Sequence, residues 1–230
     1  MKILNRYSVI NEKMPREILL LQGTGCLHKR CIYCDYYKDV SFDPFLENKK
    51  NLDKITGKTG VLDIINSGSA MELDESTINL IYKKIVDFKI HTIWFEAHWV
   101  YRKVLDKFRK KFPEILVKFR TGIETFNPEL RNFWKKGIPD VVTPFDIAKY
   151  FNGVCLLVGI QDQSKEIVKK DIETALRYFE YFNINIFAEN STSVKKNSEL
   201  INWFLKEIKP SLENNPRVEI LINNKDLGVG

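Results

Sequence analysis

Apolar stretches of strand length alternate with longer stretches of helical periodicity along most of this chain. We predict strands at residues 17–22, 61–66, 92–97, 115–121, 153–160, 184–188 and 218–222. Helix-start signals lie between them: Asp74-Glu75-Ser76 precedes a stripe of isoleucines, and Asn127-Pro128 opens a helix that Gly137 ends. Further helical faces carry Val104 and Phe108, then Val168, Ile172, Ala175, Leu176 and Phe179, then Leu200, Ile201, Phe204 and Leu205.

Regular alternation of strands and helices predicts an α/β fold with parallel strands joined by crossovers. Six such units are too few for a closed eight-unit barrel and fit a partial, open one. The periodicity is equally compatible with a doubly wound sheet. In both architectures, the side chains that carry chemistry gather at the carboxyl ends of the strands.

The composition predicts one domain over residues 1–230. The chain has 230 residues, 44% of them hydrophobic and 29% charged, and no repeat or Pro/Gly/Ser-rich linker divides it. The first residues are too mixed for a signal peptide, and no apolar run approaches the length of a membrane span. Four cysteines without an export signal favour a reducing compartment, so we expect a cytoplasmic protein.

The net charge of +6 is compatible with a nucleic-acid partner, but the lysines do not favour one. They occur as scattered pairs, most of them within helical patterns, which we interpret as solvated helix faces. The pairs are Lys49-Lys50, Lys83-Lys84, Lys110-Lys111, Lys135-Lys136, Lys169-Lys170 and Lys195-Lys196.

Three cysteines, Cys26, Cys31 and Cys34, lie in one loop at 23–38, directly behind the first predicted strand. Three thiolates can hold three irons of a 4Fe–4S cluster and leave the fourth iron open for another ligand. A structural zinc site with His28 as the fourth ligand is the main alternative. Such sites usually take their ligands in two spaced pairs, and the remaining cysteine, Cys155, is distant in sequence.

An aromatic residue, Tyr33, immediately precedes the last cysteine of the loop, and this arrangement resembles the cluster loop of the radical S-adenosylmethionine (SAM) superfamily. This chain has four residues between its first two cysteines, where the family usually has three. The resemblance implies a partial (βα)6 parallel barrel and two cofactors, a 4Fe–4S cluster on Cys26, Cys31 and Cys34, and SAM. It also implies that Tyr33 packs beside the adenine of SAM.

The resemblance implies further SAM contacts at the ends of other strands. Asn66-Ser67-Gly68 corresponds to the backbone that holds the amino group of SAM, although one glycine replaces the family's two glycines and an acid. Glu124, within Gly-Ile-Glu-Thr, corresponds to a carboxylate that binds the ribose. Arg120 suits the SAM carboxylate, because a guanidinium binds a carboxylate through two parallel hydrogen bonds. Gly159 corresponds to a strand glycine that supports adenine.

Polar and aromatic side chains at the remaining strand ends are the candidates for substrate contacts. Strand alternation places Trp94, Glu96 and His98 on one face, where a carboxylate and an imidazole are costly to bury without a purpose. A mutually satisfied core pair is the alternative interpretation. The substrate-binding candidates are Trp94, Glu96, His98, Phe187, Glu189 and Asn223, with Glu96 and His98 also as catalytic candidates.

Size, cysteine count and plan resemble those of small radical SAM enzymes that act on free 7-deazapurines. The queuine lyase subgroup, which releases 7-aminomethyl-7-deazaguanine (preQ1) from queuine, is the most similar, followed by the 7-carboxy-7-deazaguanine synthase subgroup. The resemblance implies an enzyme that uses a 5′-deoxyadenosyl radical and receives electrons from a flavodoxin- or ferredoxin-like donor. The alternatives are an activating enzyme that forms a protein radical and a zinc-binding protein that contacts nucleic acid.

Overall fold

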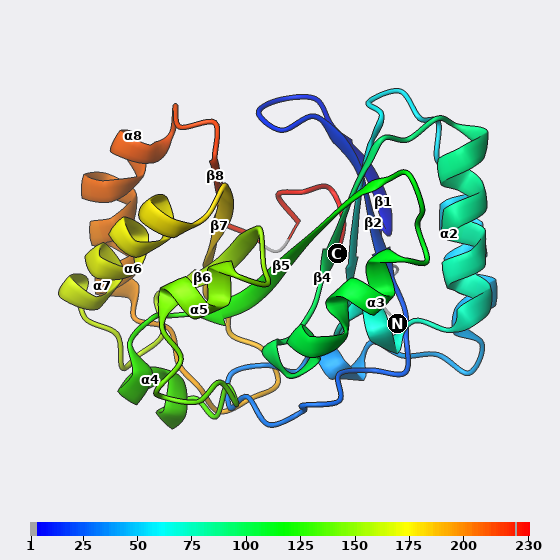
Figure 1. The fold of residues 1–230 in the computed structure, drawn as a ribbon. Coiled ribbons are helices and arrows are strands. Elements are labelled where there is room, and N and C mark those ends of the chain that lie inside the picture. The colour runs from blue at the N-terminus through cyan, green and yellow to red at the C-terminus, as the bar shows by residue number, and fades with distance from the viewer. Residues whose placement is uncertain (1–3, 224) are drawn as a thin grey trace. The chain divides into compact units, whose positions relative to one another are not determined.

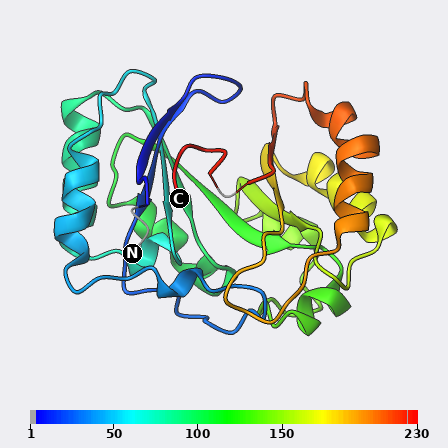
Figure 2. The same ribbon diagram turned by 180° about the vertical axis from the view of Figure 1, so that it is seen from behind.

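The computed structural model describes residues 4–223 and 225–230. Eight strands form one sheet in which the strand order follows the sequence, from β1 to β8 (Figures 1 and 2). The chain divides into two compact units. Unit 1 comprises the described residues up to Leu27, then Tyr36–Phe119 and Lys225–Gly230, and unit 2 comprises His28–Asp35 and Arg120–Asn224.

Unit 1 contains a parallel arrangement of strands with helices beside it. Its elements are β1 (Tyr7–Ile10), β2 (Arg16–Leu21), the 3₁₀ turn η1 (Tyr36–Lys38), α1 (Pro44–Leu52), β3 (Val61–Asn66), the 3₁₀ turn η2 (Ala70–Glu72), α2 (Glu75–Asp87), β4 (Thr92–Glu96), the 3₁₀ helix η3 (Trp99–Val104) and α3 (Leu105–Arg109). Strands β2, β3 and β4 pair in parallel, and β1 pairs antiparallel with β2. Strand β1 was not predicted, because its residues are all half-buried and show no alternation.

Helix α2 forms where its sequence signals predict it. The side chain of Asp74 caps the helix by accepting a hydrogen bond from the backbone of Thr77, and Ile78, Ile81 and Ile85 are buried on one face. The next predicted helix differs, because Val104 ends the 3₁₀ helix η3 and is 42% exposed.

Unit 2 repeats the strand–helix pattern. Strand β5 (Leu116–Glu124) runs from unit 1 into it, followed by α4 (Pro128–Phe133), α5 (Pro144–Ala148), β6 (Gly153–Val158), α6 (Lys165–Tyr178), β7 (Tyr181–Ile186), α7 (Ser198–Trp203), the π-helical turn η4 (Phe204–Ile208), α8 (Lys209–Leu212) and β8 (Val218–Leu221). Strands β6, β7 and β8 pair in parallel. Helices α6, α7 and α8 lie together on one side of these strands (Figures 1 and 2).

Two elements of unit 2 end earlier than the sequence predicted, in both places because the backbone turns to positive φ. Helix α4 begins after its predicted cap Asn127 but stops at Phe133, since Lys135 and Gly137 have φ of 55° and 73°. Strand β6 stops at Val158, because Gly159 has a φ of 99°. Strand β7 starts three residues before its prediction, at Tyr181.

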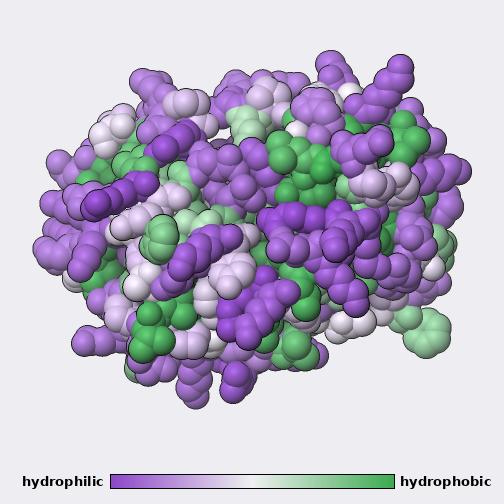
Figure 3. All heavy atoms as spheres, viewed as in Figure 1, coloured by the Kyte–Doolittle hydropathy of each residue, from purple (hydrophilic) through white to green (hydrophobic). Residues whose placement is uncertain are grey.

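The described part of the chain contains no helix that is long and apolar enough to cross a membrane. The face seen in Figure 3 is largely hydrophilic, with small hydrophobic patches between the hydrophilic side chains. The lysine pairs are exposed as predicted, except that Lys84 is half-buried and Lys136 is buried.

Candidate cofactor and substrate site

The three loop cysteines are half-buried, whereas Cys155 is buried on β6, and none of the four forms a disulfide. Cys26 belongs to unit 1, and Cys31 and Cys34 belong to unit 2, where the backbone of Cys34 donates a hydrogen bond to that of Cys31. Among the described residues, no group of three or more His, Cys, Asp and Glu side chains is close enough together to hold a metal ion. The donor chemistry still fits a cluster, since three partly accessible thiols share one loop.

A buried carboxylate that the sequence analysis missed, Glu72, anchors the cluster loop in unit 1. Its Oε1 accepts hydrogen bonds from the backbone of Leu27 at 2.7 Å and from the hydroxyl of Tyr101 at 3.0 Å. Its Oε2 accepts from the backbone of Ser69 at 2.6 Å, and its carbonyl accepts from the backbone of Thr24 at 2.9 Å. Burial, followed by the charge of Glu72, raises the pKa of Tyr101. The three-residue spacing from Ser69 to Glu72, a capping-box pattern, is the signal that could have identified this carboxylate.

The segment predicted to hold the amino group of SAM lies against the same loop. A Cβ atom on Gly68 would stand 2.9 Å from the Cα of Cys26, so only glycine fits there. The Ser67 hydroxyl donates to Asp39 at 3.0 Å, and the side-chain amide of Asn66 donates to the Ser69 carbonyl at 3.1 Å. Within unit 1, Asn66-Ser67-Gly68 therefore packs beside the first cysteine.

In unit 2 the cluster loop lies on the segment after α4. The backbone of Ile32 donates to the Trp134 carbonyl at 3.2 Å, and Nε2 of His28 hydrogen-bonds the Lys135 carbonyl at 2.7 Å. The His28 ring also fills the space that a Cβ on Gly137 would need. Burial lowers the pKa of His28. Nε2 of His28 thus connects the cluster loop to the segment after α4.

Tyr33 is a core residue with a 7% exposed side chain. Its ring meets that of Trp134 edge-on at 5.7 Å, and its carbonyl accepts a hydrogen bond from Asn190 at 2.7 Å. Burial, followed by the charges of Glu124, Cys31 and Cys34, raises the pKa of Tyr33. The ring belongs to a buried apolar cluster against which Cys31 and Cys34 pack.

The residues predicted to contact the rest of SAM occupy β5 and the end of β6. Oε1 of Glu124 accepts a hydrogen bond from Nζ of Lys136 at 2.8 Å, and Glu124 has a φ of 65° at an irregularity of the β5–β6 register. Arg120 is buried on β5. Gly159 accepts a backbone hydrogen bond from Asn197, and Ile201 of α7 occupies the space that a Cβ would need. Close packing against α7 is thus one reason for this glycine.

The strand-end group Trp94, Glu96 and His98 is less regular than alternation predicts. Strand β4 ends at Glu96, and His98 caps η3, with Nδ1 accepting a hydrogen bond from the backbone of Val100 at 3.3 Å. His98 therefore lies beyond the strand, and strand alternation does not place it on one face with Trp94 and Glu96 as predicted. Trp94 is buried, and the ammonium of Lys118 lies 5.3 Å from the centre of its ring.

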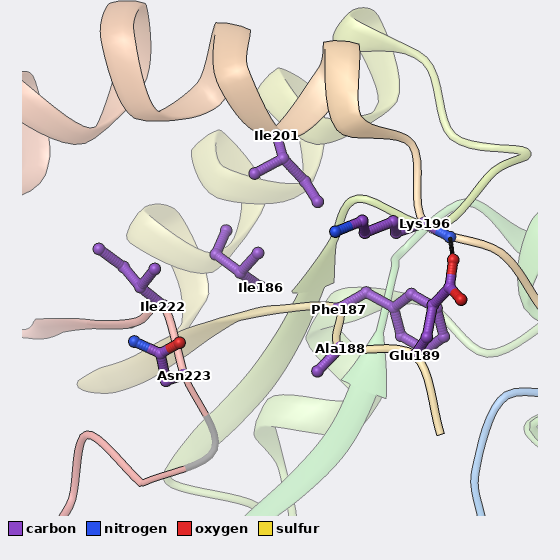
Figure 4. A pocket seen from close by; sticks show the side chains of 8 residues that line it. All are labelled: Ile186, Phe187, Ala188, Glu189, Lys196, Ile201, Ile222 and Asn223. Carbon is purple, nitrogen blue, oxygen red and sulfur yellow. Dashed lines mark hydrogen bonds between the residues drawn. The ribbon is translucent and has the colours of Figure 1, made fainter. Parts of the chain in front are cut away.

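Unit 2 has a cavity of about 390 Å³ where β7 and β8 end (Figure 4), and it brings together three predicted substrate residues, Phe187, Glu189 and Asn223. Its other lining residues are Ile186, Ala188, Lys196, Ile201 and Ile222. The Glu189 carboxylate accepts from the backbone of Lys196 at 3.2 Å and binds Lys195 at 3.2 Å. These two contacts lower the pKa of Glu189 and keep it ionised.

Strands β7 and β8 also carry polar side chains that the sequence analysis missed. The Asn183 amide donates to Oδ1 of Asn185 at 2.7 Å, and the Tyr181 hydroxyl donates to Glu219 at 2.5 Å. On β7 these side chains alternate with Phe182, Ile184 and Ile186, so they share the opposite face of the strand. The Tyr-Phe-Asn-Ile-Asn-Ile alternation was visible in the sequence, but the predicted strand began too late to include it.

Comparison with known proteins gives matches among solved structures. A queuine lyase from Clostridium spiroforme bound to SAM and queuine is 44% identical, with a TM-score of 0.95 over 99% of this chain and 100% of that one. Streptococcus suis SuiB bound to S-adenosylmethionine is 16% identical, with a TM-score of 0.55 over 91% of this chain and 48% of that one. SuiB bound to precursor peptide SuiA is 14% identical, with a TM-score of 0.59 over 94% and 50% of the two chains. No family model and no curated protein matches.

The fold is thus the partial (βα)6 parallel barrel of radical SAM enzymes, as the sequence predicted, and the SuiB structures support the fold alone. A three-cysteine loop directly after β2 accompanies it. At 44% identity over the full length of both proteins, the chain belongs to the queuine lyase family of the radical SAM superfamily.

Proposed function

We propose that this protein is a queuine lyase, a radical SAM enzyme that releases preQ1 from queuine. The observation that carries the proposal is the 44% identity, over nearly the whole chain, to a queuine lyase bound to SAM and queuine. The match extends over 99% of this chain and 100% of that enzyme, which supports a proposal for the whole reaction.

The proposed cofactors are a 4Fe–4S cluster on Cys26, Cys31 and Cys34, and SAM. When bound, the reduced cluster supplies one electron to SAM, which yields methionine and a 5′-deoxyadenosyl radical. We assign the SAM contacts to Tyr33, Asn66, Ser67, Gly68, Arg120, Glu124 and Gly159. The protein's own contribution is to hold SAM and substrate in the positions that the reaction needs and to exclude competing reactions.

The cavity at the ends of β7 and β8 has the size of a site for one small molecule. Phe187 supplies an apolar wall there, and the ionised Glu189 can accept hydrogen bonds from an amine or a hydroxyl. We further assign Trp94 as a wall for a flat ring, and Glu96 and His98 as polar contacts and catalytic candidates. A site with such groups rejects analogues that leave them unpaired.

We also infer a single radical SAM domain over residues 1–230, a cytoplasmic location, where a reduced cluster persists, and a flavodoxin- or ferredoxin-like electron donor. A nucleic-acid partner is not part of the proposal, because the lysine pairs are dispersed over the sequence.

The direct test is anaerobic incubation of the reconstituted protein with SAM, a reductant and queuine, followed by mass spectrometry. We expect preQ1 and 5′-deoxyadenosine, both dependent on SAM and reductant, and much weaker turnover in Glu96→Ala and His98→Ala. His91→Ala is the matched control, since His91 is exposed before β4 begins. Conversion of a carboxy-pterin without release of preQ1 would instead identify a 7-carboxy-7-deazaguanine synthase.

A further inference from the structure

Lys136 is buried, although it follows an exposed lysine in a pair that the sequence suggested to be solvated. Its side chain is 10% exposed and that of Glu124 is 12% exposed, and Nζ of Lys136 lies 2.8 Å from Oε1 of Glu124. An ammonium loses its hydration when it is buried, so a buried lysine needs a partner and is costly to keep. The pair therefore calls for an explanation beyond stability.

Two residues with unusual backbone angles, Glu124 and Lys135, and one close approach at Gly122 accompany this ion pair. Glu124 and Lys135 have φ of 65° and 55°, in the left-handed region that disfavours residues other than glycine. A Cβ on Gly122 would stand 2.5 Å from Oε1 of Glu124 and 3.1 Å from Nζ of Lys136. Backbone strain of this kind is tolerated mainly where it places a functional group.

The segment at residues 134–136 is also where the cluster loop is hydrogen-bonded in unit 2. Trp134 and Lys135 accept hydrogen bonds from Ile32 and His28, so the chain on either side of Cys31 is tied to the residues next to Lys136. Burial would lower the pKa of Lys136, but the charge of Glu124, with those of Cys31 and Cys34, raises it above its usual value. The ammonium thus stays charged beside a carboxylate assigned to SAM, and Lys136 directly follows the two residues to which the chain on either side of Cys31 is hydrogen-bonded.

We propose that Lys136 is a positioning residue of the cofactor site, whose ammonium holds the Glu124 carboxylate for the SAM ribose and offsets negative charge at the cluster cysteines Cys31 and Cys34. The inference rests on one part of the proposed function, the binding of the 4Fe–4S cluster and SAM, and it does not depend on the identity of the substrate. A nearby positive charge favours the reduced, more negative state of an iron–sulfur cluster, because net charge is one of the factors that set its potential.

The test compares Lys136→Met with the same change at the exposed neighbour, Lys135→Met, in the anaerobically reconstituted full-length chain. The measurements are the midpoint potential of the cluster, from a redox titration followed by electron paramagnetic resonance, and the dissociation constant of SAM. We expect Lys136→Met to shift the potential to more negative values and to weaken SAM binding about tenfold or more. Lys135→Met should change neither quantity, and Lys136→Arg should restore the potential, because it keeps the charge.

The double variant Lys136→Met/Glu124→Gln separates the effect of the Lys136 charge on the cluster from its effect on the position of the Glu124 side chain. It removes both charges, so its potential should return towards the wild-type value while SAM binding stays weak. If Lys136→Met does not take up iron, Glu124→Gln provides the reverse contrast: it leaves the ammonium without its counter-charge, so the potential should shift to less negative values while SAM binding weakens. Unchanged potential and SAM affinity in Lys136→Met would overturn the proposal. None of these measurements needs queuine, so they stand apart from the outcome of the turnover assay.

Discussion

Asp171, on α6, is the individual residue whose environment most clearly predicts a dependence on pH. It is 3% exposed, and its Oδ1 accepts a hydrogen bond from the backbone of Phe126 at 2.7 Å. Burial raises its pKa to about 7, and hydrogen bonds from Thr125 and Phe126 limit the rise. In the unfolded chain the pKa would be about 3.9. The folded state therefore binds the proton more tightly, and the stability that this group contributes falls as the pH rises from about 4 to about 7.

We expect Asp171→Asn to remove this loss, because the amide oxygen can still accept from Phe126 while the side chain no longer ionises. The free energy of unfolding of the variant, relative to the wild type, should be higher at pH 8 than at pH 5. Urea unfolding under anaerobic conditions at both pH values measures the difference. Asp162→Asn, at an exposed position just before α6, is the control. A difference between variant and wild type that is the same at both pH values would contradict the assignment.

Among the elements, the cluster loop and the β3–η2 connection depend on each other through Glu72. The two carboxylate oxygens accept from the backbones of Leu27 and Ser69 and from the hydroxyl of Tyr101. A glutamine has only one accepting oxygen, and its NH₂ group cannot accept from a backbone N–H. The loop and the Ser67-Gly68 segment should therefore loosen together when Glu72 is replaced.

We expect Glu72→Gln to lower the free energy of unfolding by about 1–3 kcal/mol, the cost of one buried donor left without its acceptor. It should also weaken SAM binding, because the segment assigned to the amino group of SAM shifts. Urea unfolding and SAM titration measure the two effects. Glu12→Gln, at an exposed position between β1 and β2, should leave both unchanged. If Glu72→Gln unfolds like the wild type, Glu72 does not anchor the loop.

For the molecule as a whole, the iron content per chain tests whether the three loop cysteines hold a 4Fe–4S cluster. We expect about four irons per chain after anaerobic reconstitution, held by Cys26, Cys31 and Cys34. Cys155→Ala should retain the iron, since Cys155 is buried on β6 and lies outside the loop. Replacing all three loop cysteines by alanine should abolish it. Iron analysis and the visible absorbance of the cluster check both variants, and a triple variant that keeps its iron would refute the ligand assignment.

Features that depend on neighbours in the chain were predictable from the amino-acid pattern. Strand β3 has the predicted bounds, and α2 and α4 begin directly after their predicted caps. A cap is a hydrogen bond between residues three apart, and amphipathic spacing repeats within a few turns, so both can be read locally. The three-cysteine loop and its aromatic residue were equally visible, and they led to the superfamily that the structural match supports.

Features that depend on residues distant in the chain were not predictable in this way. Lys135 and Lys136 are identical in sequence terms, yet one is exposed and the other buried, because Glu124, twelve positions away from Lys136, folds back to meet it. Glu72 becomes an anchor only when Leu27 and Tyr101 reach it. The cavity likewise needs the ends of β7 and β8 and helix α7 together. Whether a polar side chain is solvated or buried with a partner is settled by such long-range contacts, since the cost of burial is offset only by a group that folding brings within reach.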